Sequence, residues 1–270
     1  MTLPPLDRAE INGSIATIDA VRTPALVNYG HFTSMQVQDG CVRGLDLHLQ
    51  RLQRSTQELF GEALDIAQTR AWMRQIIDGD IRPMSLRVNV FSRSLNRDRP
   101  LEPARPDVLV TTSAARSLPR TPLRVGSVHY QREQPHLKHV GTFGLFQQKR
   151  LAQARGFDDA LFVDACGAVA EGSIWNIGFL DDSGIVWPDA PALPGISMLL
   201  LQQGLRDSNV ASVTRYVDID EIDRFRGAFF TNSSCAVMPI ACIDAIEFAI
   251  DADALALLEG CYALNPWQPL

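Results

Sequence analysis

The chain has 270 residues, of which 46% are hydrophobic and 21% are charged, so it has the length for one large or two medium globular domains. Its formal net charge of −6 argues against general affinity for nucleic acid or anionic membranes, because both require clustered positive charge. Five scattered cysteines favour reduced thiols over a disulfide framework or a zinc site. The sequence has no signal-peptide pattern and no long apolar run, which predicts a cytoplasmic protein without a membrane span.

The first half of the chain mixes strand-like and helix-like segments. Strand-like pieces occur within 10–19 and 28–44, and Asp39-Gly40 is typical of a hairpin turn. Leucines at helical spacing predict a helix over 45–61, and a second helix follows over 66–78. Two further strands are predicted over 84–93 and 107–115.

Proline-containing breakers separate the two halves. The stretch 95–106 is interpreted as a loop, and the segment SLPRTP at 117–122 is the preferred domain boundary, since proline interrupts a helix. We therefore predict a small α+β domain over 1–118, a linker over 119–122 and a larger domain over 123–270.

The second half contains more strands than helices. The predicted strands lie over 123–131, within 159–172 and 175–188 as two pairs, and over 227–240 as one strand that ends in a polar turn. The predicted helices lie over 143–156, 196–207 and 251–262. Because strands and helices do not alternate regularly, we predict the α+β fold class with two domains.

Two basic residues are candidates for chemistry. His48 and Arg51 share a helix face, and an arginine there is either a phosphate ligand or an ordinary solvated charge. Lys138, in PHLKHVGTF, is either a surface charge or a desolvated amine that forms a Schiff base. The neighbouring His129, His136 and His139 have a spacing that suits no common metal site, so we expect no metal.

An acidic residue and two turns complete the candidates. Glu171 follows an apolar strand, and its carboxylate needs a partner such as a protonated pyridine nitrogen or a structural cation. The turn LPGIS at 193–197 opens a helix, whose N-terminus favours an anion. The turn TNSS at 231–234 supplies backbone N–H groups and small hydroxyl side chains. Each turn is either an anion site or simply a capped turn.

Taken together, these motifs resemble one enzyme family. HLQRL around Arg51, then Lys138, EGSIWN from Glu171, LPGIS and TNSSCAVMPI follow the motif order of the fold-type IV pyridoxal-phosphate enzymes. This class IV aminotransferase family includes branched-chain and D-amino-acid aminotransferases, with aminodeoxychorismate lyase as a non-transaminating relative. The resemblance extends from about Gly30 to Ile240, and the spacing after Lys138 is more similar to the lyase.

The resemblance implies a cofactor and a role for each motif. Pyridoxal 5′-phosphate is expected as the cofactor, with Lys138 forming the Schiff base and moving the Cα proton. Glu171 is expected to pair with the pyridine nitrogen, which keeps the ring an electron sink. The expected phosphate ligands are Arg51 and the groups around Ile196, Ser197, Ser233 and Ser234. The resemblance also implies a β-barrel-like sheet in the larger domain and a homodimer.

The substrate side is less defined in the sequence. Arg93 and Arg97 follow a predicted strand and are either ligands of a substrate carboxylate or surface arginines. Thr33 and Ser34 are candidates for the substrate cavity. Transaminating members of the family commonly have a tyrosine five residues after the lysine, where this chain has Phe143.

We therefore expect a class IV aminotransferase that passes an amino group from an amino acid to a 2-oxo acid. A lyase acting on an amino-chorismate-like substrate is the alternative enzyme, and it would release pyruvate without an acceptor. A non-catalytic homologue that senses a metabolite is the third hypothesis. A Schiff-base lysine argues against the third, because a pure binding module has little need for one.

Overall fold

The computed structural model describes residues 6–116 and 121–270, and the chain divides into two compact units. The first unit extends to Arg116 and also contains Leu137–Gly141 and Pro266–Leu270. Of the described residues, the second unit contains 121–136 and Thr142–Asn265. Lys138 thus belongs to the first unit, although the sequence analysis assigned it to the larger domain. The predicted linker lies partly outside the described residues and remains a prediction.

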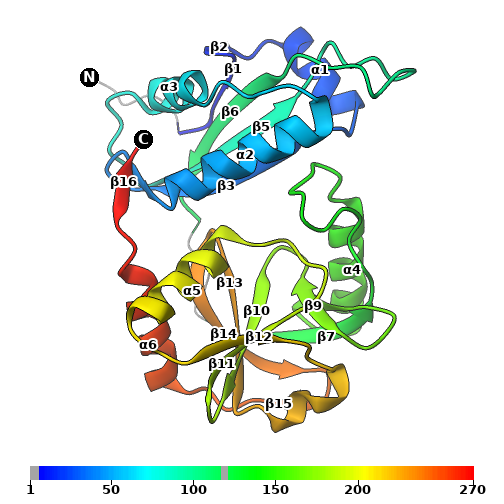
Figure 1. Cartoon of the computed structure of the whole chain (residues 1–270), viewed down its shortest axis with the longest axis vertical. Helices are drawn as coiled ribbons and strands as arrows, with labels where there is room; N and C mark the ends of the chain where they lie inside the picture. The colour runs from blue at the N-terminus through cyan, green and yellow to red at the C-terminus, as the bar shows by residue number, and fades with distance from the viewer. Residues whose placement is uncertain (1–5, 117–120) are drawn as a thin grey trace. The chain divides into compact units, whose positions relative to one another are not determined.

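The first unit is built on an antiparallel sheet with the strand order β2-β1-β6-β5-β3 (Figure 1). Its strands are β1 (Arg8–Ile11), β2 (Ser14–Ile15), β3 (His31–Val37), β5 (Met84–Phe91) and β6 (Asp107–Ala114). Helices α2 (Leu45–Phe60) and α3 (Ile66–Ile77) cover one face of the sheet, where Leu52, Met73 and Leu86 are fully buried. Burial of this apolar face is the main force that holds the unit together.

Local signals explain both of these helices, and their prediction is confirmed. In α2 the residues Leu45, Leu49 and Leu52 are buried, which is the spacing of one helix face. Gly61 ends α2 in the left-handed conformation that favours glycine. The side chain of Asp65 caps α3 by accepting a hydrogen bond from the Gln68 N–H at 2.8 Å.

The N-terminal region differs from its prediction. The stretch 10–19 holds the β1–β2 turn and then the start of helix α1 (Ile18–Leu26), where only strand-like pieces were expected. Thr17 caps α1 through its side chain, but the helix has no buried residue and contains Pro24. Because α1 lacks a buried apolar face, hydrophobic periodicity gave no signal for it. The predicted turn at Asp39-Gly40 is confirmed, and it leads into β4 (Cys41–Arg43).

The second unit contains a nine-stranded sheet, part of which closes into a barrel. Its strands are β7 (Leu123–His129), β8 (Asp159–Val163), β9 (Val169–Gly172), β10 (Asn176–Asp181), β11 (Gly184–Pro188), β12 (Ser212–Arg215), β13 (Gly227–Asn232), β14 (Cys235–Ile243) and β15 (Ile246–Glu247). The strands β10-β13-β14-β7-β8-β9 pair in that order, and β9 pairs back with β10. The predicted α+β class with a barrel-like sheet is therefore confirmed.

Side chains from the barrel strands form the core of the second unit, including Val125, Leu161, Ile177 and Ile240. Helices α4 (Phe143–Ala154), α5 (Ile196–Asp207) and α6 (Ala252–Ala263) match the three predicted helices within a few residues, and a short 3-10 helix, η1, covers Ile219–Arg224. The predicted single strand over 227–240 is instead the hairpin β13–β14. The polar residues 231–234, which were predicted to end a single strand, form the turn of this hairpin.

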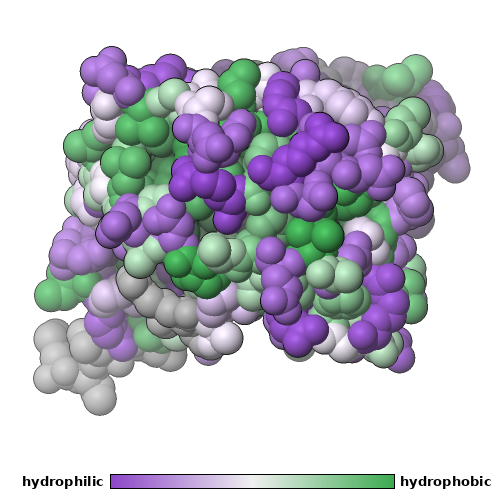
Figure 2. Space-filling model, turned by 90° about the horizontal axis from the view of Figure 1, so that it is seen from below, coloured by the Kyte–Doolittle hydropathy of each residue, from purple (hydrophilic) through white to green (hydrophobic). Residues whose placement is uncertain are grey.

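Within the described residues, no helix is both long and apolar enough to cross a membrane. The face of the molecule in Figure 2 is a mosaic in which hydrophilic and hydrophobic residues are interspersed.

Candidate active site

Lys138 lies in a short segment that pairs with β3, the edge strand of the first unit's sheet. The backbone N–H of Phe32 donates to the Lys138 carbonyl at 2.9 Å, and the Val140 N–H donates to the Gly30 carbonyl at 3.0 Å. Gly30 is required there because a Cβ atom would lie 2.5 Å from the Val90 carbonyl oxygen. The backbone of the lysine is therefore fixed by strand pairing.

The amine of Lys138 lies close to an aromatic ring and a second cation. Its Nζ atom is 4.9 Å from the centroid of the Phe32 ring, and the Arg87 guanidinium carbon is 3.6 Å from the same centroid. Arg87 donates to Asn89 at 2.8 Å, and no carboxylate in the described part of the chain lies within ion-pair distance of it. Burial lowers the pKa of Arg87. A partly buried guanidinium without an acidic partner is suited to bind a carboxylate.

The chain contains just two lysines, and they have different surroundings. Lys149, on α4, forms an ion pair with Asp159 at 2.8 Å between Nζ and Oδ2. The amine of Lys149 is thus engaged with a carboxylate. Lys138 is the better candidate for a nucleophilic amine, because strand pairing fixes its backbone and its charge acts on the buried His48 next to Arg51.

Arg51 lies one turn beyond His48 on α2. The Thr33 hydroxyl and His48 Nδ1 are hydrogen-bonded at 2.5 Å, and both side chains are buried. Burial, reinforced by the charges of Arg51 and Lys138, lowers the pKa of His48 to about 3, so its imidazole is neutral at physiological pH. The electrostatic coupling brings Arg51, His48 and Lys138 into one neighbourhood of the first unit.

Alternation along β3 separates the two predicted hydroxyl groups. Thr33 points toward α2 and is engaged with His48. Ser34 points to the opposite face of the sheet, where it is the direct cross-strand partner of Arg87. Of the two predicted substrate residues, Ser34 therefore lies on the sheet face that also carries Phe32 and Arg87.

In the second unit, Glu171 is a buried carboxylate with fixed partners. It is 4% exposed, and its Oε2 atom accepts a hydrogen bond from the Leu193 N–H at 3.2 Å. Its Oε1 atom lies 3.8 Å from Nη1 of Arg132, which is also buried. Arg132 was not predicted from the sequence, where the requirement of a buried carboxylate for a partner was the only signal that pointed toward such a residue.

The motifs EGSIWN and LPGIS are coupled through Asn176. Its Nδ2 atom donates to the Leu193 carbonyl at 2.8 Å, and Leu193 in turn donates to Glu171. A Cβ atom on Gly195 would lie 2.0 Å from Asn176 Oδ1, so only glycine allows this approach. Gly195 is the N-cap of α5, and the buried Ile196 and Ser197 follow in its first turn. The first-turn N–H groups of a helix favour an anion.

The TNSS motif forms the β13–β14 turn. Asn232 Oδ1 accepts hydrogen bonds from the N–H groups of Ser234 at 2.9 Å and Cys235 at 3.0 Å. The Ser234 N–H is therefore already used within the turn, while Ser233 is exposed and Ser234 half-buried. The hydroxyl groups of these two serines are better placed than the Ser234 N–H to meet an anion.

Three of the motif residues form a row across adjacent strands. Glu171 on β9 pairs directly with Asn176 on β10, and Asn176 pairs with Thr231 on β13. Directly opposed residues of antiparallel strands project to the same side of a sheet, so these three side chains share one side of the barrel wall.

A pyridoxal phosphate group fits the donors and acceptors of these residues. The hydroxyl groups of Ser173 and Thr231 are buried and have no hydrogen-bond partner among the described residues. Buried polar groups are usually satisfied, so unpartnered hydroxyls beside a fixed carboxylate are suited to a polar ligand. Within the second unit, the two motif turns supply groups for a phosphate.

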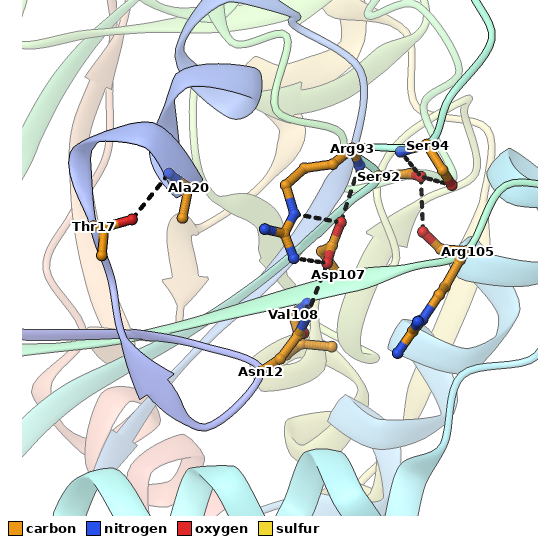
Figure 3. A network of polar contacts seen from close by, with 9 residues as sticks. All are labelled: Asn12, Thr17, Ala20, Ser92, Arg93, Ser94, Arg105, Asp107 and Val108. Carbon is orange, nitrogen blue, oxygen red and sulfur yellow. Dashed lines mark hydrogen bonds and ion pairs between the residues drawn. The ribbon is translucent and has the colours of Figure 1, made fainter.

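The remaining predicted residues have other contacts. Arg93 forms two hydrogen bonds with the carboxylate of Asp107, and Asn12 donates to the same carboxylate, as Figure 3 shows. Arg97 lies exposed in the following loop. His129 contacts the Asp164 carbonyl. In the described ranges, no three His, Cys, Asp or Glu side chains cluster in a way that could hold a metal ion.

The family of the chain follows from comparison with known proteins. The sequence model of the amino-transferase class IV family matches residues 30–243, so the chain belongs to that family. A probable branched-chain-amino-acid aminotransferase from Rickettsia felis is 32% identical over 97 residues, which are 36% of this chain and 33% of that protein. The chain thus matches about a third of the length of that relative.

Two further similarities cover nearly the whole chain. Aminodeoxychorismate lyase from Bacillus subtilis is 23% identical over 276 residues, which cover 90% of this chain and 89% of the lyase. The solved structure of a hypothetical aminotransferase from Mycobacterium tuberculosis, in a PLP-bound form, has a TM-score of 0.78 at 17% identity and covers 95% of this chain and 98% of that one. The structural likeness supports the fold assigned to the family.

Proposed function

We propose that this chain is a pyridoxal-phosphate-dependent aminotransferase that transfers an amino group from an amino acid to a 2-oxo acid. The observation that carries the proposal is the position of Lys138, whose backbone is fixed by pairing with β3 and whose charge acts on the buried His48 beside Arg51. The other lysine, Lys149, forms an ion pair with Asp159. Membership of the class IV family and the PLP-bound neighbour support the cofactor.

The cofactor, when bound, supplies an electron sink that stabilises the charge left when an amino acid loses its Cα proton. Lys138 would supply the amine that holds the cofactor, and once the amine of the substrate has displaced it, the freed amine of Lys138 would accept and return the Cα proton. Glu171 would hold the pyridine nitrogen and favour its protonated form. The low-dielectric surroundings of Glu171 strengthen this interaction.

Phosphate and substrate are assigned to different residues. Arg51 would bind the phosphate by charge-assisted hydrogen bonds, and Ile196, Ser197, Ser233 and Ser234 would supply further groups for it. For the substrate carboxylate we favour Arg87 and Ser34, which are cross-strand partners. Thr33 is already engaged with His48, and Arg93 with Asp107; Arg97 remains a candidate. The homodimer and cytoplasmic location expected from the sequence remain predictions.

The test is an absorption titration with pyridoxal phosphate, followed by borohydride reduction and peptide mapping. We expect a visible band in the wild-type protein and in Lys149→Ala, and none in Lys138→Ala. Reduction should attach the label to the peptide that contains Lys138. A label on Lys149, or a full band in Lys138→Ala, would overturn the assignment of the amine.

The lyase remains the second candidate, because the similarity to aminodeoxychorismate lyase covers 90% of this chain and Phe143 replaces the tyrosine of transaminating relatives. Phe143 is 79% exposed and cannot donate a hydrogen bond. Release of pyruvate without an added 2-oxo acid would identify a lyase. Conversion of the visible band by an amino acid, followed by its return with a 2-oxo acid, would identify an aminotransferase.

A further inference from the structure

The segment Pro266–Leu270 returns to the first unit and packs beside the start of α2. Strand β16 (Trp267–Pro269) pairs antiparallel with β4, and the Leu270 N–H donates to the Gly40 carbonyl at 3.1 Å. The Leu270 side chain is buried in the same core as the leucines of α2. The segment is therefore an integral part of the first unit.

Within this segment, Gln268 contacts the first turn of α2 through both ends of its amide. Its Oε1 atom accepts a hydrogen bond from the Leu45 N–H at 2.7 Å. Its Nε2 atom donates to Asp46 Oδ2 at 3.0 Å. The N-cap of this helix is Gly44, which has no side chain to perform this task. Most helices are capped by a residue next to them in sequence, whereas α2 is capped by Gln268, more than two hundred positions away.

This first turn leads directly to the candidate cofactor ligands. The backbone N–H of His48 donates to the Gly44 carbonyl at 3.1 Å and closes the first turn of α2. The side chain of His48 is also the hydrogen-bond partner of Thr33. Arg51 lies one turn further along. Loss of the cap would allow the first turn to fray, and Arg51 would then have to be ordered when the phosphate binds.

We propose that Gln268 is a positioning residue that holds α2 in the form in which Arg51 binds the phosphate of the cofactor. The inference rests on the proposed function, because it assumes that Arg51 is the phosphate ligand. It identifies a residue outside the sequence motifs as a determinant of cofactor affinity.

The experiment compares the affinities for pyridoxal 5′-phosphate and for pyridoxal, which lacks the phosphate. In Gln268→Ala we expect the dissociation constant for pyridoxal phosphate to rise about fivefold, as for the loss of one helix cap, while that for pyridoxal changes less than about twofold. Amide hydrogen exchange should become faster in the peptide that contains residues 45–48. Gln57→Ala, the same change on the exposed face of α2, is the matched control and should leave all three readouts unchanged.

Two further variants keep the outcome decisive. Gln268→Asn retains the amide but is too short to reach both partners, so it should also lose preference for pyridoxal phosphate over pyridoxal. It replaces Gln268→Ala in the experiment if the alanine variant does not fold. The inference would be overturned if affinity fell equally for pyridoxal phosphate and pyridoxal. It would also be overturned if the ratio of the two affinities and the amide hydrogen exchange of residues 45–48 both stayed as in the wild type. Arg51→Ala separates the two proposals. If this variant still prefers pyridoxal phosphate to pyridoxal, Arg51 is not the phosphate ligand. If Arg51→Ala loses this preference and the Gln268 variants keep it, only the role of Gln268 is overturned.

Discussion

Arg132 and Glu171 form an ion pair in which both side chains are buried, with 3.8 Å between Nη1 and Oε1. Burial lowers the pKa of Arg132, and the charge of Glu171 acts in the opposite direction. Each charge therefore compensates part of the desolvation of the other. The pair lets a carboxylate remain in the barrel wall before any ligand arrives.

We predict that Arg132→Met destabilises the protein by about 3–5 kcal/mol, because Glu171 would remain buried without its ion pair to Arg132. A protonated pyridine nitrogen can replace part of the lost interaction, so pyridoxal phosphate should raise the melting temperature of Arg132→Met more than that of the wild type. Thermal denaturation with and without the cofactor measures both effects. Arg226→Met, which removes the partly exposed ion pairs with Asp182 and Asp251, is the control and should change stability by less than about 1 kcal/mol. A stable Arg132→Met protein would contradict the prediction.

A second prediction concerns the glycine of the LPGIS loop. Gly195→Ala would force Asn176 away from Leu193, and the hydrogen-bonded chain from Asn176 to Glu171 would be disturbed. We expect a loss of about 1–3 kcal/mol in unfolding free energy, together with weaker binding of pyridoxal phosphate. The matched change Gly260→Ala lies in α6 with open space around it and should stabilise the protein by about 0.5–1 kcal/mol. Urea unfolding distinguishes the two, and equal effects would refute the close-approach argument.

A third prediction compares Arg87, in the middle of β5, with Arg93, two residues beyond its end. Arg93→Met should lower stability by about 1–2 kcal/mol through its contacts with Asp107, while the KM for the amino acid stays nearly constant. Arg87→Met should instead raise KM about tenfold or more, because it removes a guanidinium that has no acidic partner. Steady-state kinetics on the identified substrate give the answer. The reverse pattern would assign the substrate carboxylate to Arg93.

The fourth prediction is a loss of stability in mild acid. Burial lowers the pKa of both His31 and His48 from 6.5 to about 3, so each is neutral in the folded protein. Below pH 6.5 the unfolded chain binds protons that the folded chain does not, so stability is greatest above that pH and falls as the pH decreases toward 3. The expected slope is about 1.4 kcal/mol per pH unit for each histidine.

Urea unfolding between about pH 7.5 and about pH 5 measures this slope before most carboxylates titrate. His48→Gln should remove the contribution of one histidine and reduce the slope by about half. A slope that is the same in the variant and the wild type would show that His48 is not buried as a neutral group.

Much of the local structure followed from the sequence. The helices α2 to α6 were predicted because their apolar spacing, caps and terminal glycines are all signals within a few residues. The helix α1 was missed because it buries no side chain and so carries no periodic pattern. The β13–β14 hairpin was read as one strand because its turn, Asn232 to Cys235, lies within a continuous strand-like segment.

The order of motifs along the sequence by itself determined the family and named Lys138, Glu171 and Arg51 as candidates. Only the tertiary structure decided that Lys138 pairs with β3, that Arg132 is the partner of Glu171, and that Gln268 caps α2. These partners are separated by tens to hundreds of residues. Periodicity and capping signals report on neighbours within one element, whereas the register of strands and the return of distant segments depend on burial of the whole core.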